Sequence, residues 1–279
     1  MKFANLAGRA VLLVGGGAID LARASDGALP SDPMCALARW DEVLAFAAST
    51  DVEPEPFDLA LLGAPVPRPG QVFAIALNYH PHIGEAGYLA PSAPLVFTKF
   101  PSCISGPYTE VALPGGHVDW EVELVVVIGR PAHHVSAERA YDVVAGLTVG
   151  QDISERILQL RGTPAQFSLG KSYPGFGPIG PAIITPDEFV DPDNLAISCR
   201  LNGEEVQGAR TGEMVFSVAE LIVQLTAVCQ MYAGDLIFTG TPGGVGNRRE
   251  PAMFLAPGDE LVSTIEEIGE LRNRFISGQ

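Results

Sequence analysis

Short apolar runs recur along the chain from about residue 70 onward, and glycine or proline interrupts them repeatedly. Runs of this length, bounded by turn residues, are typical of β-strands. In chain order they are VFAIAL, PLVFTKF, VELVVVIG, AGLTVGQDI, GPAIIT, LAISCRLN, DLIFTG and ELVSTIEEIG. The pattern predicts a sheet-rich domain of the α+β class and argues against an all-helical fold.

Two segments, residues 136–144 and residues 217–231, have helical periodicity instead. In the second, apolar side chains recur at the spacing of one helix face. These side chains are Val218, Leu221, Ile222, Leu225 and Val228. Both segments are predicted to be helices that pack against the sheets.

Residues 1–65 are organised differently from the rest of the chain. A strand, a turn at Gly15–Gly17, a second short strand and a helical stretch at residues 40–48 follow one another, and several prolines end the segment. We predict a small N-terminal α/β module at 1–65 and a main domain at 66–279. The glycines do not form a dinucleotide-binding fingerprint, because Asp20 stands where the third glycine is required.

Charge and composition narrow the possible partners. The 33 acidic residues outnumber the 17 basic ones, and the formal net charge of −16 repels nucleic acids and anionic membrane surfaces. No apolar run approaches the roughly 18 residues that a membrane helix requires. The four cysteines are widely spaced and form no metal-binding pair. We therefore expect a cytoplasmic protein with reduced thiols, no nucleic-acid partner and no membrane association.

The run HVDWEVELVVVIG combines Glu121 and Glu123 with one of the most apolar stretches of the chain. Side chains two apart on a strand share a face, with their Cα atoms about 6.6 Å apart. Two carboxylates there would repel each other and lose hydration unless a cation neutralises them. An edge strand with a solvated face is the alternative.

Asp152 favours the interpretation as a cation site over that as a solvated edge strand. It follows an apolar strand in LTVGQDISERILQ, where its side chain can emerge at the rim of a pocket. Mg²⁺ and Mn²⁺ prefer oxygen ligands and retain exchangeable waters. Glu121, Glu123 and Asp152 are therefore candidate ligands of one such ion.

Further polar residues could act beside this ion. His82 and Glu85 in LNYHPHIGE are spaced so that the carboxylate can orient the imidazole of a general base, although a surface pair would have the same spacing and His80 could serve instead. Lys171 lies in a Gly/Pro-rich loop, either facing solvent or binding a substrate carboxylate. Arg156 and Gln159 follow Asp152 by one and two helical turns, so all three could project from one helix face toward the same ligand, although a plain amphipathic turn would have the same spacing. The pair His133–His134 is predicted to be a surface feature.

An ordered series of motifs resembles the fumarylacetoacetate hydrolase family over about residues 70–275. The motifs are NYxxHxxE from Asn78 to Glu85, LVFTKF, DWEVELVVVIG, GLTVGQDISERILQ, LGKSYPGFGPIGP, LNGEEVQ and GDLIFTGTPGGVG. The resemblance implies a mixed β-roll or β-sandwich catalytic domain, a homodimer, and Mg²⁺ or Mn²⁺ held by Glu121, Glu123 and Asp152. It also implies that His82 and Glu85 act together as the catalytic base and lie on a lid.

The same resemblance implies a small oxo-acid substrate, with Lys171, Arg156, Gln159 and Thr241 contacting its carboxylate and oxo groups. Hydrolysis of a carbon–carbon bond in an acylpyruvate or related β-diketo acid is the first prediction. An isomerase, tautomerase or decarboxylase that uses the same ion is the alternative, and a non-catalytic metabolite-binding homologue is an alternative of another class. Tyr173-Pro174-Gly175 departs from the usual family sequence after the lysine and leaves the choice of substrate open.

Overall fold

The structure is a computed structural model that describes residues 1–80 and 91–278. These residues form three sheets, which confirms the prediction of a sheet-rich α+β fold. The strands are β1 (Lys2–Leu6), β2 (Arg9–Val14), β3 (Gly17–Asp20), β4 (Leu62–Gly63), β5 (Val72–Ala76), β6 (Leu95–Thr98), β7 (Ile104–Ser105), β8 (Glu110–Leu113), β9 (Val118–Asp119), β10 (Val122–Ile128), β11 (Val144–Gln151), β12 (Ser154–Glu155), β13 (Gly177–Ile184), β14 (Ala196–Leu201), β15 (Glu204–Arg210), β16 (Leu236–Phe238), β17 (Glu260–Ile265) and β18 (Gly269–Ser277).

Helices are short and lie around the sheets. The α-helices of the described residues are α1 (Leu21–Ala24), α2 (Pro33–Leu37), α3 (Trp40–Ser49), α5 (Arg156–Gln159) and α6 (Val218–Thr226). The 3-10 helices are η1 (Leu59–Leu61), η2 (Pro101–Cys103), η3 (Ala137–Val143), η4 (Leu169–Lys171), η5 (Pro186–Glu188), η6 (Thr211–Glu213) and η7 (Gly246–Arg248). No helix in the described part of the chain is long and apolar enough to cross a membrane.

The large sheet contains eleven strands, and its main path runs β3-β2-β1-β13-β11-β10-β16-β5-β6. Strand β10 pairs antiparallel with β11 and β16, and all its residues are buried. Leu124 and Val126 belong to one hydrophobic cluster, whereas Val125 and Val127 belong to a second. A strand covered on both faces has a continuous apolar sequence, which explains the run VELVVVI.

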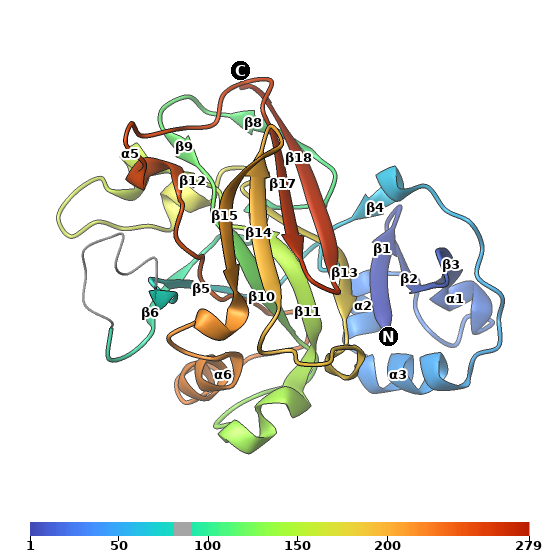
Figure 1. The fold of residues 1–279 in the computed structure, drawn as a ribbon. Coiled ribbons are helices and arrows are strands. Elements are labelled where there is room, and N and C mark those ends of the chain that lie inside the picture. The colour runs from blue at the N-terminus through green and yellow to red at the C-terminus, as the bar shows by residue number, and fades with distance from the viewer. Residues whose placement is uncertain (81–90, 279) are drawn as a thin grey trace.

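The five-stranded sheet, in the order β15-β14-β17-β18-β8, packs against one face of the large sheet (Figure 1). Its inward side chains share the cluster of Leu124 and Val126. They include Ile197, Leu201, Leu261, Ile265 and Leu271. The two sheets thus enclose a sandwich core, and β10 and β11 form its centre.

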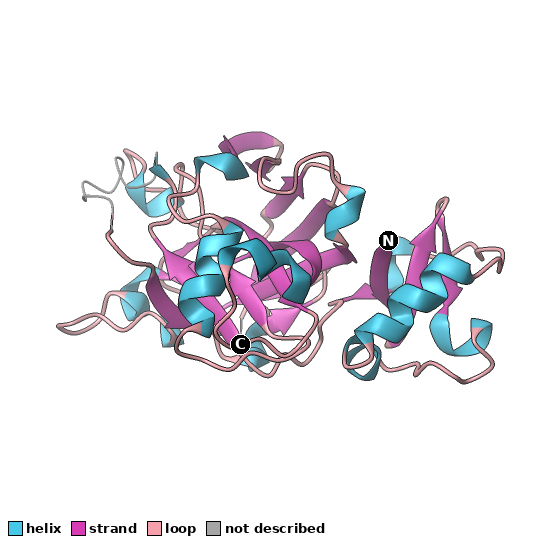
Figure 2. Ribbon diagram, turned by 90° about the horizontal axis from the view of Figure 1, so that it is seen from below, coloured by secondary structure: helices cyan, strands magenta, loops and turns pink. Residues whose placement is uncertain are grey.

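The N-terminal segment forms a lobe at one side of the molecule (Figure 2). Strand β1 pairs with β13 of the main body, so β1 to β3 extend the large sheet. The turn predicted from the glycines is confirmed, because Val14 pairs with Gly17 across Gly15 and Gly16. Both turn glycines have positive φ, at 56° and 84°, which glycine adopts without steric cost. The boundary at residue 65 stays a prediction.

The two helices predicted in the main domain are present but shorter or tighter than expected. Residues 136–144 contain the 3-10 helix η3, in which Ala140 and Val143 are buried at the three-residue spacing of that helix. The second helix ends at Thr226, whose hydroxyl donates to the carbonyl of Ile222 at 2.7 Å. Val228 is 81% exposed, so its predicted place on the packing face is wrong.

Helix α6 begins with a capping box. The Ser217 hydroxyl accepts from the amide of Glu220 at 3.3 Å, and the Glu220 carboxylate accepts from the amide of Ser217 at 2.8 Å. This pairing satisfies two amides that have no partner within the helix.

Replacing the capping serine tests this contribution. Ser217→Ala is expected to lower the free energy of unfolding by about 1 kcal/mol, because the first turn loses its cap. Ser136→Ala is the control, because Ser136 precedes η3 without a side-chain hydrogen bond to the helix backbone. Urea denaturation measures both variants. Equal losses in the two would contradict the role of the cap.

Candidate active site

The β10–β11 hairpin brings the three predicted metal ligands together. Glu121 immediately precedes β10, Glu123 lies within it, and Asp152 immediately follows β11. The register pairs Val122 with Gln151, and the amide of Asp152 donates to the carbonyl of Glu121 at 2.9 Å. One carboxylate oxygen from each acid lies within 4.8 Å of the others, and all three residues are buried. The alternative of a solvated edge strand is therefore wrong.

This donor set fits a divalent cation. Mg²⁺ and Mn²⁺ bind carboxylate oxygens in clusters of this kind. Burial raises the pKa of Glu123 well above its usual value, and the neighbouring charges of Asp152 and Glu121 raise it further. Three carboxylates this close need positive charge nearby to remain ionised together.

Two lysines supply part of that charge. Lys171, which is 2% exposed, donates from Nζ to Glu121 Oε2 at 3.0 Å and to Asp152 Oδ2 at 2.6 Å. Lys99 is fully buried and donates from Nζ to Asp152 Oδ1 at 2.7 Å. Burial opposes the charge on Lys99, but neighbouring acidic groups, first among them Asp152 and also Glu123, together outweigh it and raise the pKa of the ammonium. The solvent-facing alternative for Lys171 is wrong.

Arg156 supplies the third cation. Its guanidinium donates to Glu121 Oε1 at 2.6 Å, to Gln159 Oε1 at 2.9 Å, and through Nη2 to Asp119 Oδ2 at 2.7 Å. Both Arg156 and Gln159 are buried, so a plain amphipathic turn is excluded. The predicted helical face shared with Asp152 is also wrong, because α5 begins only at Arg156. The residues converge because the chain turns between β11 and α5.

The TGTP loop after β16 holds the acids from another side. The amide of Gly240 donates to Glu123 Oε2 at 2.8 Å, and the Thr241 hydroxyl donates to the carbonyl of Val122 at 2.9 Å. Gly240 has φ of 99°, and a Cβ there would lie 2.7 Å from the Asn78 Cβ. Both the conformation and the close approach therefore require glycine.

Several site residues were not singled out from the sequence. Lys99 is one, although a lone lysine that ends the run PLVFTK was the available signal. Asp119 is another, adjacent to the acidic pair. Gln151 and Gln207 accept from the successive amides of Glu121 and Val122, at 2.9 and 3.0 Å. These glutamines hold the start of β10, and no sequence pattern connected Gln207 with it.

The predicted base residues His82 and Glu85 lie outside the described residues, so their roles stay predictions. The alternative His80 is described and is exposed. Asn78, just before it, is fully buried and donates to the carbonyls of Phe216 and Thr239 at 3.0 and 2.8 Å. The pair His133–His134 is exposed, as predicted.

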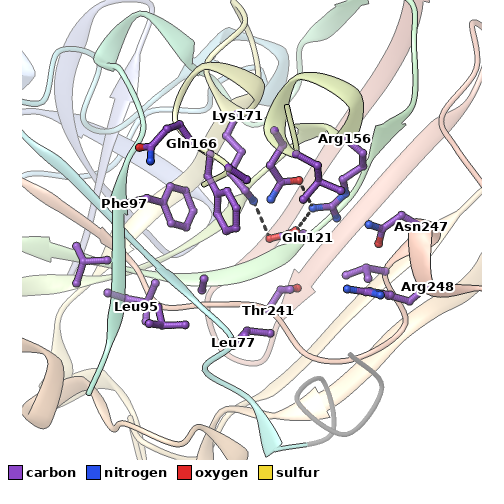
Figure 3. A pocket seen from close by; sticks show the side chains of 18 of the residues that line it. Leu77, Leu95, Phe97, Glu121, Arg156, Gln166, Lys171, Thr241, Asn247 and Arg248 are labelled. Carbon is purple, nitrogen blue, oxygen red and sulfur yellow. Dashed lines mark hydrogen bonds and ion pairs between the residues drawn. The ribbon is translucent and has the colours of Figure 1, made fainter. Parts of the chain in front are cut away.

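A cavity of about 680 Å³ opens beside the acidic cluster (Figure 3). Its polar wall contains Glu121, Arg156, Gln159, Gln166, Lys171, Thr241, Asn247 and Arg248. Its apolar wall comes from β5, β6 and the neighbouring loops, and includes Ile75, Leu77, Leu95, Val96, Phe97 and Phe167. Of the acidic cluster, Glu121 reaches the cavity wall, together with Lys171. The arrangement can bind a small anionic molecule next to a bound cation.

The fold and the acidic site define a class of enzyme. Residues 71–276 match the family model described as fumarylacetoacetate (FAA) hydrolase C-terminal. The chain belongs to the fumarylacetoacetate hydrolase family, which confirms the resemblance seen in its motifs.

Individual relatives are similar over nearly the whole chain. The human mitochondrial oxaloacetate tautomerase FAHD2A is 44% identical, and the match covers 94% of this chain and 85% of that protein. A solved structure of a Mycobacterium smegmatis protein is 47% identical, with a TM-score of 0.95 and full coverage of both chains. The maleylpyruvate hydrolase of Sphingobium sp. SYK-6, solved with manganese(II) and pyruvate, is 30% identical, with a TM-score of 0.81 and full coverage of both chains.

Metal binding can be tested apart from activity. Glu123→Gln is expected to weaken Mn²⁺ binding at least tenfold, since it removes a charged ligand from the cluster. Glu53→Gln is the control, because Glu53 is an exposed glutamate. Isothermal titration with MnCl₂ on protein dialysed against a chelator measures both. Unchanged affinity in Glu123→Gln would remove this residue from the ligand set.

The buried lysine can be tested by stability. Lys99→Met leaves Asp152 with one cation fewer in a buried site, and breaking such a pair costs about 3–5 kcal/mol. Lys2→Met, at an exposed strand residue, should change the free energy of unfolding by less than about 0.5 kcal/mol. Urea denaturation in the presence of EDTA measures both variants. Equal stability of the two would show that Lys99 does not balance the acids.

Proposed function

We propose that this chain is a divalent-metal-dependent tautomerase that interconverts the keto and enol forms of a 2-oxo acid. The observation that carries the proposal is the placement of Glu121 and Lys171 in the wall of a cavity, with Glu123 and Asp152 buried beside them. The 44% identity with an oxaloacetate tautomerase supports this choice of reaction.

The residues that would hold the ion are Glu121, Glu123 and Asp152, whose carboxylates form a site suited to Mg²⁺ or Mn²⁺. When bound, the ion supplies Lewis-acid stabilisation of the negative charge that develops on the oxygen of an enolising 2-oxo acid. The similar maleylpyruvate hydrolase, solved with manganese(II), supports this choice of cation.

The side chains around the ion have separate roles. Lys171 places an ammonium in the cavity wall, where it can donate a hydrogen bond to the 2-oxo oxygen or to the enol oxygen derived from it. Gln159 and Arg156 form the adjoining wall and orient the carboxylate next to the oxo group. Apolar side chains such as Phe97, whose ring centroid lies 5.1 Å from Lys171 Nζ, exclude water from the reacting carbon.

Proton transfer at carbon requires a base. His82, oriented by Glu85, is the residue predicted for this role from the sequence. A tautomerase needs one group to remove the proton from C3 and a donor to protonate the oxygen, so His82 and Lys171 together suffice. The reaction consumes no water.

Hydrolysis of a carbon–carbon bond, the first prediction from the sequence, becomes the second candidate. It is favoured by the likeness to maleylpyruvate hydrolase, which extends over both full chains. The higher identity with the oxaloacetate tautomerase favours the tautomerase, which the sequence offered as an alternative. The two reactions share the ion and differ in whether His82 activates a water molecule.

An assay with enol-oxaloacetate distinguishes these reactions. The ultraviolet absorbance of the conjugated enol should decay faster with the Mn²⁺-loaded protein than in buffer, and EDTA should remove the acceleration. Release of pyruvate from acylpyruvates, measured in parallel, reports hydrolysis. Pyruvate release without faster enol decay would replace the tautomerase by the hydrolase.

Lys171 is the described residue on which the proposed reaction depends most. Lys171→Met is expected to lower kcat for enol decay about 10²-fold to 10⁴-fold, the usual contribution of a positioned proton donor. Lys2→Met is the matched control and should retain the wild-type rate. Circular dichroism confirms that each variant is folded. Wild-type kcat in Lys171→Met would exclude the lysine from proton transfer.

A further inference from the structure

Most cations near the cavity are already neutralised. Lys171 is paired with Glu121 and Asp152, and Arg156 is paired with Glu121 and Asp119. Their charge is balanced before any substrate enters. Positive charge for a second anionic group of the substrate must therefore come from elsewhere in the cavity wall.

Arg248 provides such a charge. It ends η7, lines the cavity, and makes no side-chain ion pair or hydrogen bond with the residues that the structure describes. Figure 3 shows its side chain beside Thr241 and Asn247, across the cavity from Gln166 and Lys171. Among the described lysines and arginines that line the cavity, Arg248 alone has no carboxylate partner.

The neighbouring arginine has a different environment. Arg249 donates to the carbonyls of Val206 and Gly244 at 2.6 and 3.3 Å, and its guanidinium lies 5.9 Å from the ring centroid of Trp120. Through these contacts Arg249 holds the loop in place. Arg248, by contrast, contributes nothing comparable to the structure of the loop.

The backbone that carries Arg248 is fixed by Asp119, the acid next to the metal-ligand cluster. Asp119 accepts from the amides of Gly246 and Asn247 at 2.7 and 2.9 Å and also pairs with Arg156. A Cβ at Gly246 would lie 2.1 Å from the carbonyl oxygen of Met253, so the loop is closely packed at that point. The same carboxylate thus positions both Arg156 and the backbone that carries Arg248, which lie next to each other in the cavity wall (Figure 3).

Asn247 adds a second polar group at this end. Its Oδ1 is buried without a hydrogen-bond partner in the described structure, whereas its amide nitrogen points toward the cavity in Figure 3. A ligand carboxylate could accept from this nitrogen and from the guanidinium of Arg248 together. Arginine suits this role because its planar donors match the two oxygens of a carboxylate.

We propose that Arg248, assisted by Asn247, binds a second carboxylate of the substrate and makes this enzyme selective for 2-oxo dicarboxylic acids. The proposal rests on the proposed function for the end of the substrate that is placed beside the metal ligands. It adds which residue recognises the opposite end. The apolar part of the cavity wall, which includes Leu77 and Leu95, would contact the short carbon chain that joins the two carboxylates.

The first experiment compares oxaloacetate with its 4-monoethyl ester, which keeps the 2-oxo acid end but lacks the second charge. Arg248→Gln is expected to lower the ratio of kcat/KM for oxaloacetate to that for the ester about tenfold, mainly through KM. The moderate size follows from the exposure of Arg248, because water screens its charge. Arg161→Gln, at an exposed arginine outside the cavity lining, controls for the change in net charge. An unchanged ratio in Arg248→Gln would overturn the proposal.

The second experiment measures binding without enolisation of the ligand, over a time in which no carbon dioxide is released. The dianion of 3,3-dimethyloxaloacetate has both carboxylates but no proton at C3, so it cannot form an enol. Titration into Mn²⁺-loaded protein should show about tenfold weaker binding to Arg248→Gln than to wild type, and a smaller difference for the 4-monoester. Weaker binding of the dianion to Arg248→Gln, together with no faster decay of enol-oxaloacetate in the wild-type protein, would refute the proposed function and leave the assignment of Arg248 standing. Equal binding of the dianion to both proteins would overturn the assignment.

Discussion

The close approach of three buried carboxylates is the constraint on which the rest of this site depends. Oxygens of Glu121, Glu123 and Asp152 lie within 4.8 Å of one another, away from solvent. Such a cluster is costly unless cations surround it. Lys99, Lys171 and Arg156 meet this need and come from three separate segments of the chain. With Asp119 included, four carboxylates face three cations, and a divalent ion would convert the remaining negative charge into a positive one. Such a balance favours an anionic substrate.

Both sheets of the fold help to fix the positions of these charged side chains. Strand β10 is buried on both faces, so the sandwich core fixes the position of Glu123. Gln151 reaches from β11 and Gln207 from β15 to the first amides of this segment, which ties both sheets to one point. Gln151 also donates to Ser263 of β17 at 2.8 Å. The second sheet therefore contributes hydrogen bonds to the site as well as apolar packing.

Local patterns in the sequence predicted the strands and the acidic triad well. The alternation around Glu121 and Glu123 and the acid after the next strand were sufficient, because both features are local and a hairpin joins them. Lys99 was missed because a lysine that ends an apolar run resembles an ordinary strand end. The extension of the large sheet by β1 could not be foreseen, since its partner β13 lies far along the chain and pairing registers at such separation leave no local signal. Val228 was misplaced because apolar periodicity continued beyond Thr226, where α6 ends.

Asp119 connects the proposed metal site with the proposed second anion site. Its carboxylate accepts from the guanidinium of Arg156 and from two backbone amides of the loop that carries Arg248. Because Asp119 holds both Arg156, which contacts Glu121, and the backbone of the Arg248 loop, the spacing between the metal ligands and the proposed second anion site is set by the core rather than by a surface loop. A substrate of fixed length is best recognised by charges held at a fixed distance. The selectivity proposed for 2-oxo dicarboxylic acids would thus depend on how the acidic cluster is buried.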